Sequence, residues 1–355
     1  MVLGVFMEVG TGTLPRPPRV VTEEWEEVML APQAMRSART RGRLHPQDPC
    51  PFRTDFQRDR DRILHSKTFR RLAAKTQVFV APRSDHDRTR LTHTLEVCQV
   101  ARTIARALRL NEDLTEAIAL GHDLGHSPYG HTGEAALDEV YRLYDPTARF
   151  HHSEQSLRVV DMLERDGQGL NLTWEVREGI LRHSKGDADW PFAGKTTTTL
   201  EAQLVALCDR IAYSSHDIDD ALRIGRLAIE DLPANIVERL GVSHSARLTA
   251  MVSDVIAASQ ELTTIKMTPA MTQLTNQLKD FMYENLYLSR SMAPKVRAHI
   301  KQVIQGLFHY FMTHPEAADL SSALPTPELA RAVCDHIAGM TDHFAERQYH
   351  RLVRK

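Results

Sequence analysis

The chain has few cysteines, no long apolar run and almost no net charge, and each absence excludes a class of protein. The four cysteines lie far apart and form no CxxC pair, which argues against a zinc ribbon or a disulfide framework and fits a reducing compartment. No run of about 18 apolar residues occurs, so the sequence predicts no membrane span. Lysine and arginine number 44 against 46 acidic residues, so the net charge of −2 gives no reason to expect tight nucleic-acid binding. We therefore expect a cytoplasmic protein.

The sequence also lacks the alternation of buried strands and helices that is typical of a parallel-sheet fold. Apolar residues recur mainly at intervals of three and four, which predicts helices, and residues 75–82 are the one strand-like run. Thr22, followed by several glutamates, predicts the start of the first helix. The expected fold is an all-α multi-helix bundle with at most one small β-hairpin near 75–90. We expect a partly disordered N-terminal extension over 1–38, a core over 39–232, and a helical C-terminal region over 233–355 packed on that core.

Histidine, by contrast, is concentrated in one part of the chain. Seven of the 18 histidines lie between His86 and His152. His122 and His126 are four residues apart and would share one face of a helix. Pro128 then breaks that helix, so the chain should turn and bring residues 131–134 back toward the same place.

Metal-type side chains occur on separate predicted helices: His93 on one, His122 and Asp123 on a second, and Asp209 on a third. Two histidines and two carboxylates can hold a divalent ion and leave positions open for water or substrate. Taken singly, His93 could lie on a polar face and Asp209 could form a surface ion pair with Arg210. However, Asp209 lies among apolar neighbours, where an unpaired carboxylate is costly.

These residues belong to longer motifs, which cover residues 59–79, 88–97, 121–134, 152–158, 200–220 and 337–345. The motifs resemble the HD-domain superfamily of metal-dependent phosphohydrolases, and most closely its deoxynucleoside triphosphate triphosphohydrolases, called dGTPase-like in bacteria. The resemblance implies an HD-domain α-helical fold and a divalent metal such as Mg, Mn, Co, Fe or Ni. It also implies hydrolysis of dGTP or several dNTPs to deoxynucleoside and inorganic triphosphate. Alternatives are another HD-family nucleotidase or phosphodiesterase, or a non-catalytic nucleotide-sensing or nucleic-acid-binding protein on the same fold.

The resemblance also implies a role for each matching residue. His93, His122, Asp123 and Asp209 would hold the metal; His126 and His131 would contact phosphates; Glu134 and His152 would form a carboxylate–histidine pair near the scissile bond. His126 and His152 both remain candidates for the general acid. His151 precedes His152 and could shift the assignment by one residue, although Ser156, four residues after His152, favours His152.

Further residues match positions that contact substrate in the family. Arg90 would contact phosphate, since guanidinium forks suit phosphate oxygens, and Lys185 is a weaker candidate for a phosphate contact. Tyr213 would pack on the deoxyribose, Asp217 would bond its 3′-hydroxyl, and Gln77 would lie near the sugar. Tyr213 could also be an ordinary half-buried helix residue.

The expected partners follow from the same resemblance. A dNTP would be the substrate, the protein would form a homo-oligomer, and a nucleotide effector could act at subunit contacts. The arginines within residues 36–43 form either a solvated loop or an anion contact. They would be the test region for weak single-stranded DNA binding.

Overall fold

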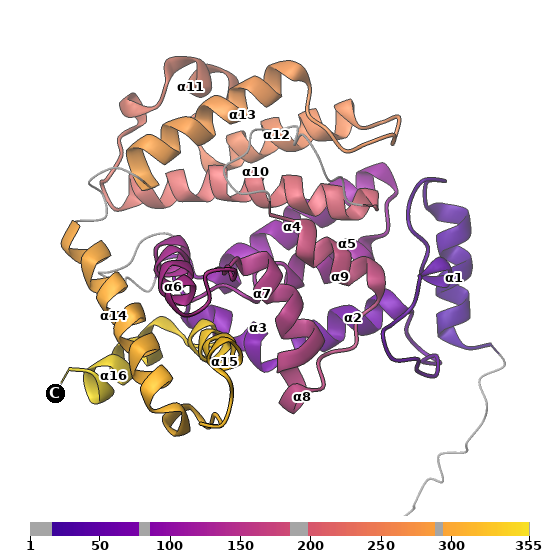
Figure 1. Ribbon diagram of the computed structural model, residues 1–355. Helices are drawn as coiled ribbons and strands as arrows, with labels where there is room; N and C mark the ends of the chain where they lie inside the picture. Colours follow the sequence, from indigo (N-terminus) through magenta and orange to yellow (C-terminus); the bar gives the residue numbers. More distant parts are fainter. Residues whose placement is uncertain (1–15, 78–85, 185–197, 288–293, 355) are drawn as a thin grey trace, which may run out of the picture.

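The computed structural model describes residues 16–77, 86–184, 198–287 and 294–354, and these ranges contain helices but no β-strand (Figure 1). The predicted all-α class is therefore confirmed. The strand-like run at 75–82 lies partly outside the described residues. Its described part forms only an isolated bridge, between Thr76 and Thr89.

Three helices that pack against one another form the centre of the molecule: α4 (Arg90–Leu108), α5 (Glu112–Gly121) and α10 (Leu200–Arg223). Around them pack α2 (Asp55–Leu64), α9 (Trp174–Arg182), α12 (His244–Ala258) and α13 (Pro269–Met282). In Figure 1, α12 and α13 lie together with α11 (Ala234–Leu240) as a layer over α10. The apolar side chains of these helices make one buried cluster, so the central helices are fixed on several sides.

A second buried apolar cluster joins α6 to the C-terminal helices. Its helices are α6 (Gly130–Tyr144), α14 (Pro294–Thr313), α15 (Thr326–Ala338) and α16 (Asp342–Leu352). Shorter or peripheral elements are α1 (Pro18–Met29), α3 (Lys67–Arg71), α7 (His152–Arg158), α8 (Glu164–Gly167), the 3-10 turns Ser37–Arg39, Leu72–Ala74, Ile229–Asp231 and Pro315–Ala318, and the π-turns Val159–Leu163 and Tyr283–Tyr287. None of the described helices combines the length and the apolar character that crossing a membrane requires.

Buried polar contacts tie the second cluster to the turn between α5 and α6. Asp342, the first residue of α16, accepts hydrogen bonds from the backbone N–H of Thr76 and of Tyr129, both at 3.1 Å. The fully buried Lys75 ammonium donates to the last carbonyl of α15 at 2.8 Å and to the carbonyl of His126. The C-terminal helices therefore hold the histidine-rich turn directly.

Helix ends agree with the sequence in some places and differ in others. The sequence also predicts a helix over residues 174–182, and α9 spans this range. The first helix begins at Pro18 rather than after Thr22, because proline at the first helical position costs no hydrogen bond. Thr22 lies inside this helix, where its hydroxyl bonds the carbonyl of Pro18 at 3.1 Å. The division of the chain near residues 38 and 232 stays a prediction.

Arginines of the basic segment at 36–43 pair with other parts of the protein, although Arg39 and Arg41 are exposed. Arg36 is buried and donates to the carbonyls of Leu30, Ala31 and Ala34, in the segment that follows α1. Arg39 pairs with Glu27 at 2.8 Å, and Arg43 pairs with Asp55 at 2.7 Å. These three guanidiniums thus stabilise the N-terminal part of the fold, and DNA binding here remains a prediction.

Candidate active site

The four residues predicted to hold a metal lie together where α4, α5 and α10 meet. His93 is in the first turn of α4, Asp209 is in the middle of α10, and His122 and Asp123 follow the last residue of α5. Both histidines and Asp123 are buried, whereas the side chain of Asp209 is about a quarter exposed. Pairwise packing of the three helices brings these distant parts of the chain to one point.

The facing atoms of these side chains lie at distances suited to a shared ion. His93 Nε2 is 3.1 Å from Asp209 Oδ1 and 3.8 Å from Asp123 Oδ2. His122 Nε2 is 3.5 Å from Asp123 Oδ1 and 3.9 Å from Asp209 Oδ1. Ligand atoms bonded to one ion at about 2.0–2.2 Å lie roughly 3 Å apart or a little more. Small side-chain movements would complete such a set.

The local backbone fixes which nitrogen of His122 faces the centre. His122 Nδ1 donates to the carbonyl of Ala119 at 2.7 Å, so Nε2 carries the lone pair. This Nε2 is buried and has no hydrogen-bond partner among the described residues. A buried acceptor without a partner is costly, and a metal ion is the group that would satisfy it.

The protonation states also suit a metal. Burial lowers the pKa of His93, which favours the neutral imidazole. Burial alone would raise the carboxyl pKa values, but His122, His126 and Arg90 hold the pKa of Asp123 well below its usual range. His93 and His122 likewise lower the pKa of Asp209. Neutral imidazoles and ionised carboxylates are the forms that coordinate a divalent transition metal.

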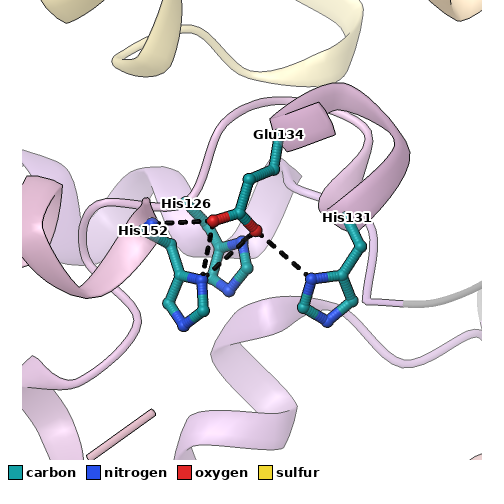
Figure 2. A group of neighbouring side chains, drawn as sticks. All are labelled: His126, His131, Glu134 and His152. Atoms are coloured by element: carbon teal, nitrogen blue, oxygen red, sulfur yellow. Dashed lines mark hydrogen bonds and ion pairs between the residues drawn. The ribbon is translucent and has the colours of Figure 1, made fainter. Parts of the chain in front are cut away.

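Beside this centre, Glu134 lies between histidine rings, as Figure 2 shows. Its carboxylate is 2.9 Å from His152 Nδ1, 3.3 Å from His131 Nδ1 and 3.9 Å from His126 Nδ1. The His126 and His152 rings stack with centroids 4.0 Å apart, whereas the His131 side chain is 75% exposed. Burial would raise the pKa of Glu134, but His152 and His131 hold it well below the usual range.

Helix α7 presents His152, rather than His151, to Glu134. The backbone N–H of His152 donates to Glu134 at 2.8 Å, while His151 Nδ1 caps α7 by accepting from the N–H of Ser153. One turn into α7, Ser156 Oγ donates to the carbonyl of His122 at 2.7 Å and accepts from the N–H of residue 125 at 2.8 Å. Ser156 therefore fixes the distance between the two groups of histidines.

Arg90 lies between the metal-type residues and the histidines around Glu134, and its guanidinium has unused hydrogen-bond donors. It is 1% exposed, and its Nη1 donates to Asp123 Oδ2 at 2.7 Å. Its Nε and Nη2 are buried and have no hydrogen-bond partner among the described residues. Gly130 has φ +59°, and a Cβ there would lie 3.4 Å from Arg90 Nη2 and 3.2 Å from the carbonyl of Gln77, so this turn closes tightly over the guanidinium.

Two of the predicted sugar-binding residues, Tyr213 and Asp217, lie on consecutive turns of α10 after Asp209. Tyr213 is half-buried and Asp217 is buried. Gln77 is half-buried, and its buried Oε1 has no hydrogen-bond partner among the described residues. Lys185 lies outside the described residues.

Two buried histidines of this region were not expected from the sequence. His183, directly after α9, lies edge-on to His122 with ring centroids 4.9 Å apart, and burial lowers its pKa to about 3. His183, His122 and Asp209 form a further group able to hold an ion. His216 on α10 contacts His93. It is seven residues, or about two helical turns, after Asp209, so the helical period could have placed it on the same face.

Comparison with known proteins agrees with this geometry. Residues 90–214 match the HD domain, and residues 265–351 match the phosphohydrolase-associated domain. The chain is 51% identical over 334 residues to a deoxyguanosinetriphosphate triphosphohydrolase-like protein of Caldanaerobacter subterraneus subsp. tengcongensis, covering 93% of this chain and 94% of that protein. Proteins of the same name from Desulfatibacillum aliphaticivorans and Geobacter sulfurreducens are 49% and 40% identical, covering 93% and 92% of this chain and 96% of each relative.

Proposed function

Because the chain belongs to the HD-domain family of deoxyguanosinetriphosphate triphosphohydrolase-like proteins, we propose that it hydrolyses deoxynucleoside triphosphates to deoxynucleoside and inorganic triphosphate. The observation that carries the proposal is a buried centre that combines metal-type ligands with unpaired hydrogen-bond donors. His122 Nε2 has a buried lone pair that needs a metal ion or a hydrogen-bond donor. Arg90, which is bonded to Asp123, has two buried donors, Nε and Nη2, that need acceptors. A metal and the phosphates it binds would supply both.

His93, His122, Asp123 and Asp209 would hold the divalent ion, whose identity the residues leave open. When bound, such an ion lowers the pKa of a water molecule toward neutrality. Arg90 would bind phosphate oxygens through its Nε and Nη2, while its Nη1 stays on Asp123. Charge that develops on the phosphate during cleavage is then met by a guanidinium already in place.

Proton transfer to the leaving 5′-oxygen falls to the histidines around Glu134. Glu134 holds His152 Nδ1, so the opposite nitrogen of that ring is the one available for proton transfer. Burial, together with the charge of Arg90, lowers the pKa of His126 well below its usual range, so this ring stays neutral. Of these two candidates, we therefore assign His152 as the residue that donates the proton. We assign the contact with phosphate to His126 and the exposed His131.

Tyr213 and Asp217 would select the sugar. A ring packed under the deoxyribose excludes a 2′-hydroxyl by its bulk, and a buried carboxylate can accept a hydrogen bond from the 3′-hydroxyl. We expect Tyr213→Ala to narrow the preference for dGTP over GTP, measured as the ratio of the two kcat/KM values. An unchanged ratio would remove Tyr213 from the sugar site.

The test is to incubate the purified protein with each dNTP and with dNTP mixtures, over a panel of divalent ions, and to identify the products. Mixtures are included because a required nucleotide effector would hide activity in single-substrate assays. We expect deoxynucleoside and triphosphate, and no activity in Asp209→Asn. Release of orthophosphate or pyrophosphate, or cleavage of monophosphates or cyclic nucleotides, would instead assign another HD-family activity.

A further inference from the structure

A chain of buried contacts leads away from the proposed metal ligand His93. His93 Nδ1, the nitrogen facing away from Asp209, lies 3.2 Å from His216 Nε2, and the two rings are nearly perpendicular. His216 Nδ1 lies 2.6 Å from Glu96 Oε2. Both histidines are at most 1% exposed. The contacts therefore run from α10 back to α4, which carries both His93 and Glu96.

The outer end of this chain is fixed by Arg88. Its Nε donates to Glu96 Oε1 at 3.0 Å, and its Nη1 donates to Asp220 at 2.6 Å and to the carbonyl of His216 at 3.3 Å. Burial would raise the pKa of Glu96, but His216 and Arg88 lower it to about 2. Glu96 is thus an ionised carboxylate held in place, and it can accept a hydrogen bond from an N–H of His216.

The hydrogen-bond pattern has one consistent direction when His93 binds a metal. His93 Nε2 faces Asp209 and Asp123, so its lone pair goes to the ion and Nδ1 must carry the hydrogen. His216 Nε2 must then accept, which places the His216 hydrogen on Nδ1, facing Glu96. Metal-binding histidines commonly donate their second nitrogen to such a partner, and loss of that partner typically weakens metal binding by about 10–100-fold.

We propose that His216, held by Glu96 and Arg88, is a positioning residue that sets the ring orientation and tautomer of His93 for metal binding. This inference rests on the proposed function only in taking His93 as a metal ligand. The inference adds His216, a residue that touches neither the ion nor the reacting phosphate. His216 acts entirely through His93.

The same nitrogen also connects the metal centre to the sugar site. His216 Nε2 lies 3.3 Å from Asp217 Oδ1, the carboxylate proposed to bind the 3′-hydroxyl. A nitrogen that accepts from His93 cannot at the same time donate to Asp217. With His93 bound to a metal, His216 Nε2 therefore accepts from His93 and does not donate to this oxygen of Asp217.

The experiment measures metal binding directly, by titrating metal-free protein with Mn²⁺ in a calorimeter. We expect His216→Ala to raise the Mn²⁺ dissociation constant by about 10–100-fold and Glu96→Gln to raise it by about tenfold. His216→Gln should restore most of the affinity, because its amide oxygen can accept from His93 Nδ1. Ser215→Ala, a buried neighbour on α10, serves as the control and should bind as wild type does.

The outcomes separate this inference from the proposed function. If wild type binds Mn²⁺ and releases triphosphate while both His216 variants bind Mn²⁺ equally tightly, the positioning role is wrong and the proposed function stands. If wild type binds no divalent ion, the proposed metal centre fails first. If His216→Ala does not fold, Glu96→Gln decides, and unchanged affinity in that variant would likewise overturn the inference.

Discussion

Replacing Arg90 by lysine separates the charge of this residue from its hydrogen-bond geometry. The guanidinium is buried, spends Nη1 on Asp123 and leaves Nε and Nη2 without a partner among the described residues. If those two nitrogens bind phosphate, lysine keeps the positive charge beside Asp123 but cannot form the fork. The change should therefore harm substrate binding and catalysis more than it harms metal binding.

The size of the effect follows from the two lost contacts. A hydrogen bond that involves a charged group contributes about 1.5–3 kcal/mol, so two contribute about 3–6 kcal/mol. At 1.36 kcal/mol for each factor of ten, kcat/KM should fall by roughly 10²–10⁴-fold. The lower end is the expectation for lysine, and the upper end for Arg90→Met, which also removes the charge.

The assay follows triphosphate release from dGTP and, separately, the affinity of the metal-loaded protein for inorganic triphosphate. The control is Arg102→Lys, also on α4, where a side chain that is 41% exposed contacts Glu112 and Glu116. We expect this control to behave as wild type. If Arg90→Lys keeps kcat/KM and triphosphate affinity within about threefold of wild type, the buried donors do not bind phosphate and the reasoning is refuted.

Three further predictions concern stability, packing and the metal. Burial raises the pKa of Glu201 to about 7, so its contribution to stability is present below the ordinary carboxyl pKa and is lost as pH rises through about 7. The free energy of unfolding in urea should therefore fall between pH 5 and 8, and Glu201→Gln should remove up to about 3 kcal/mol of that fall. Equal pH profiles for this variant, wild type and the exposed control Glu238→Gln would contradict this. At Gly125 a Cβ would lie 2.1 Å from the backbone nitrogen of Ser156, so Gly125→Ala should displace α7 and His152 and lower kcat about 10²-fold with Mn²⁺ still bound; unchanged kcat would show that this contact is dispensable. Chelation should lower the thermal midpoint of wild type, since an ion at 100 times its dissociation constant stabilises by about 2.7 kcal/mol. The same chelator should leave Asp209→Asn unchanged, and an equal shift in both would place the ion elsewhere.

Local sequence was enough to predict the helices and the convergence of the metal-type residues. Residues 174–182 carry a clear helical period and form α9 as predicted. Pro128 did indicate the turn after His122 and His126, because a proline cannot continue a helix. The roles assigned to these residues stay proposals, although their side chains lie within reach of one another.

Other features depend on contacts that no local pattern reveals. Asp342 bonds the backbone of Thr76 and Tyr129 across more than 200 residues of chain. His183 has a single-histidine context that looks like an ordinary core position, and only packing of α9 against α5 brings it to His122. The helical spacing from Asp209 indicates the face on which His216 lies, but its contact with His93 depends on packing of α10 against α4. The sequence predicts that the first helix starts at Thr22, whereas α1 starts at Pro18, because proline fits the first helical position, where its missing N–H costs no hydrogen bond.

The central claim is that this centre breaks the bond between the α-phosphorus and the 5′-oxygen of a dNTP, so that triphosphate is released intact. It is tested most directly by hydrolysis of dGTP, or of a dNTP mixture, in water labelled with heavy oxygen, followed by mass spectrometry of both products. Attack at the α-phosphorus predicts one label in the triphosphate and none in the deoxynucleoside. Label in the deoxynucleoside, or release of pyrophosphate or orthophosphate in place of triphosphate, would contradict it.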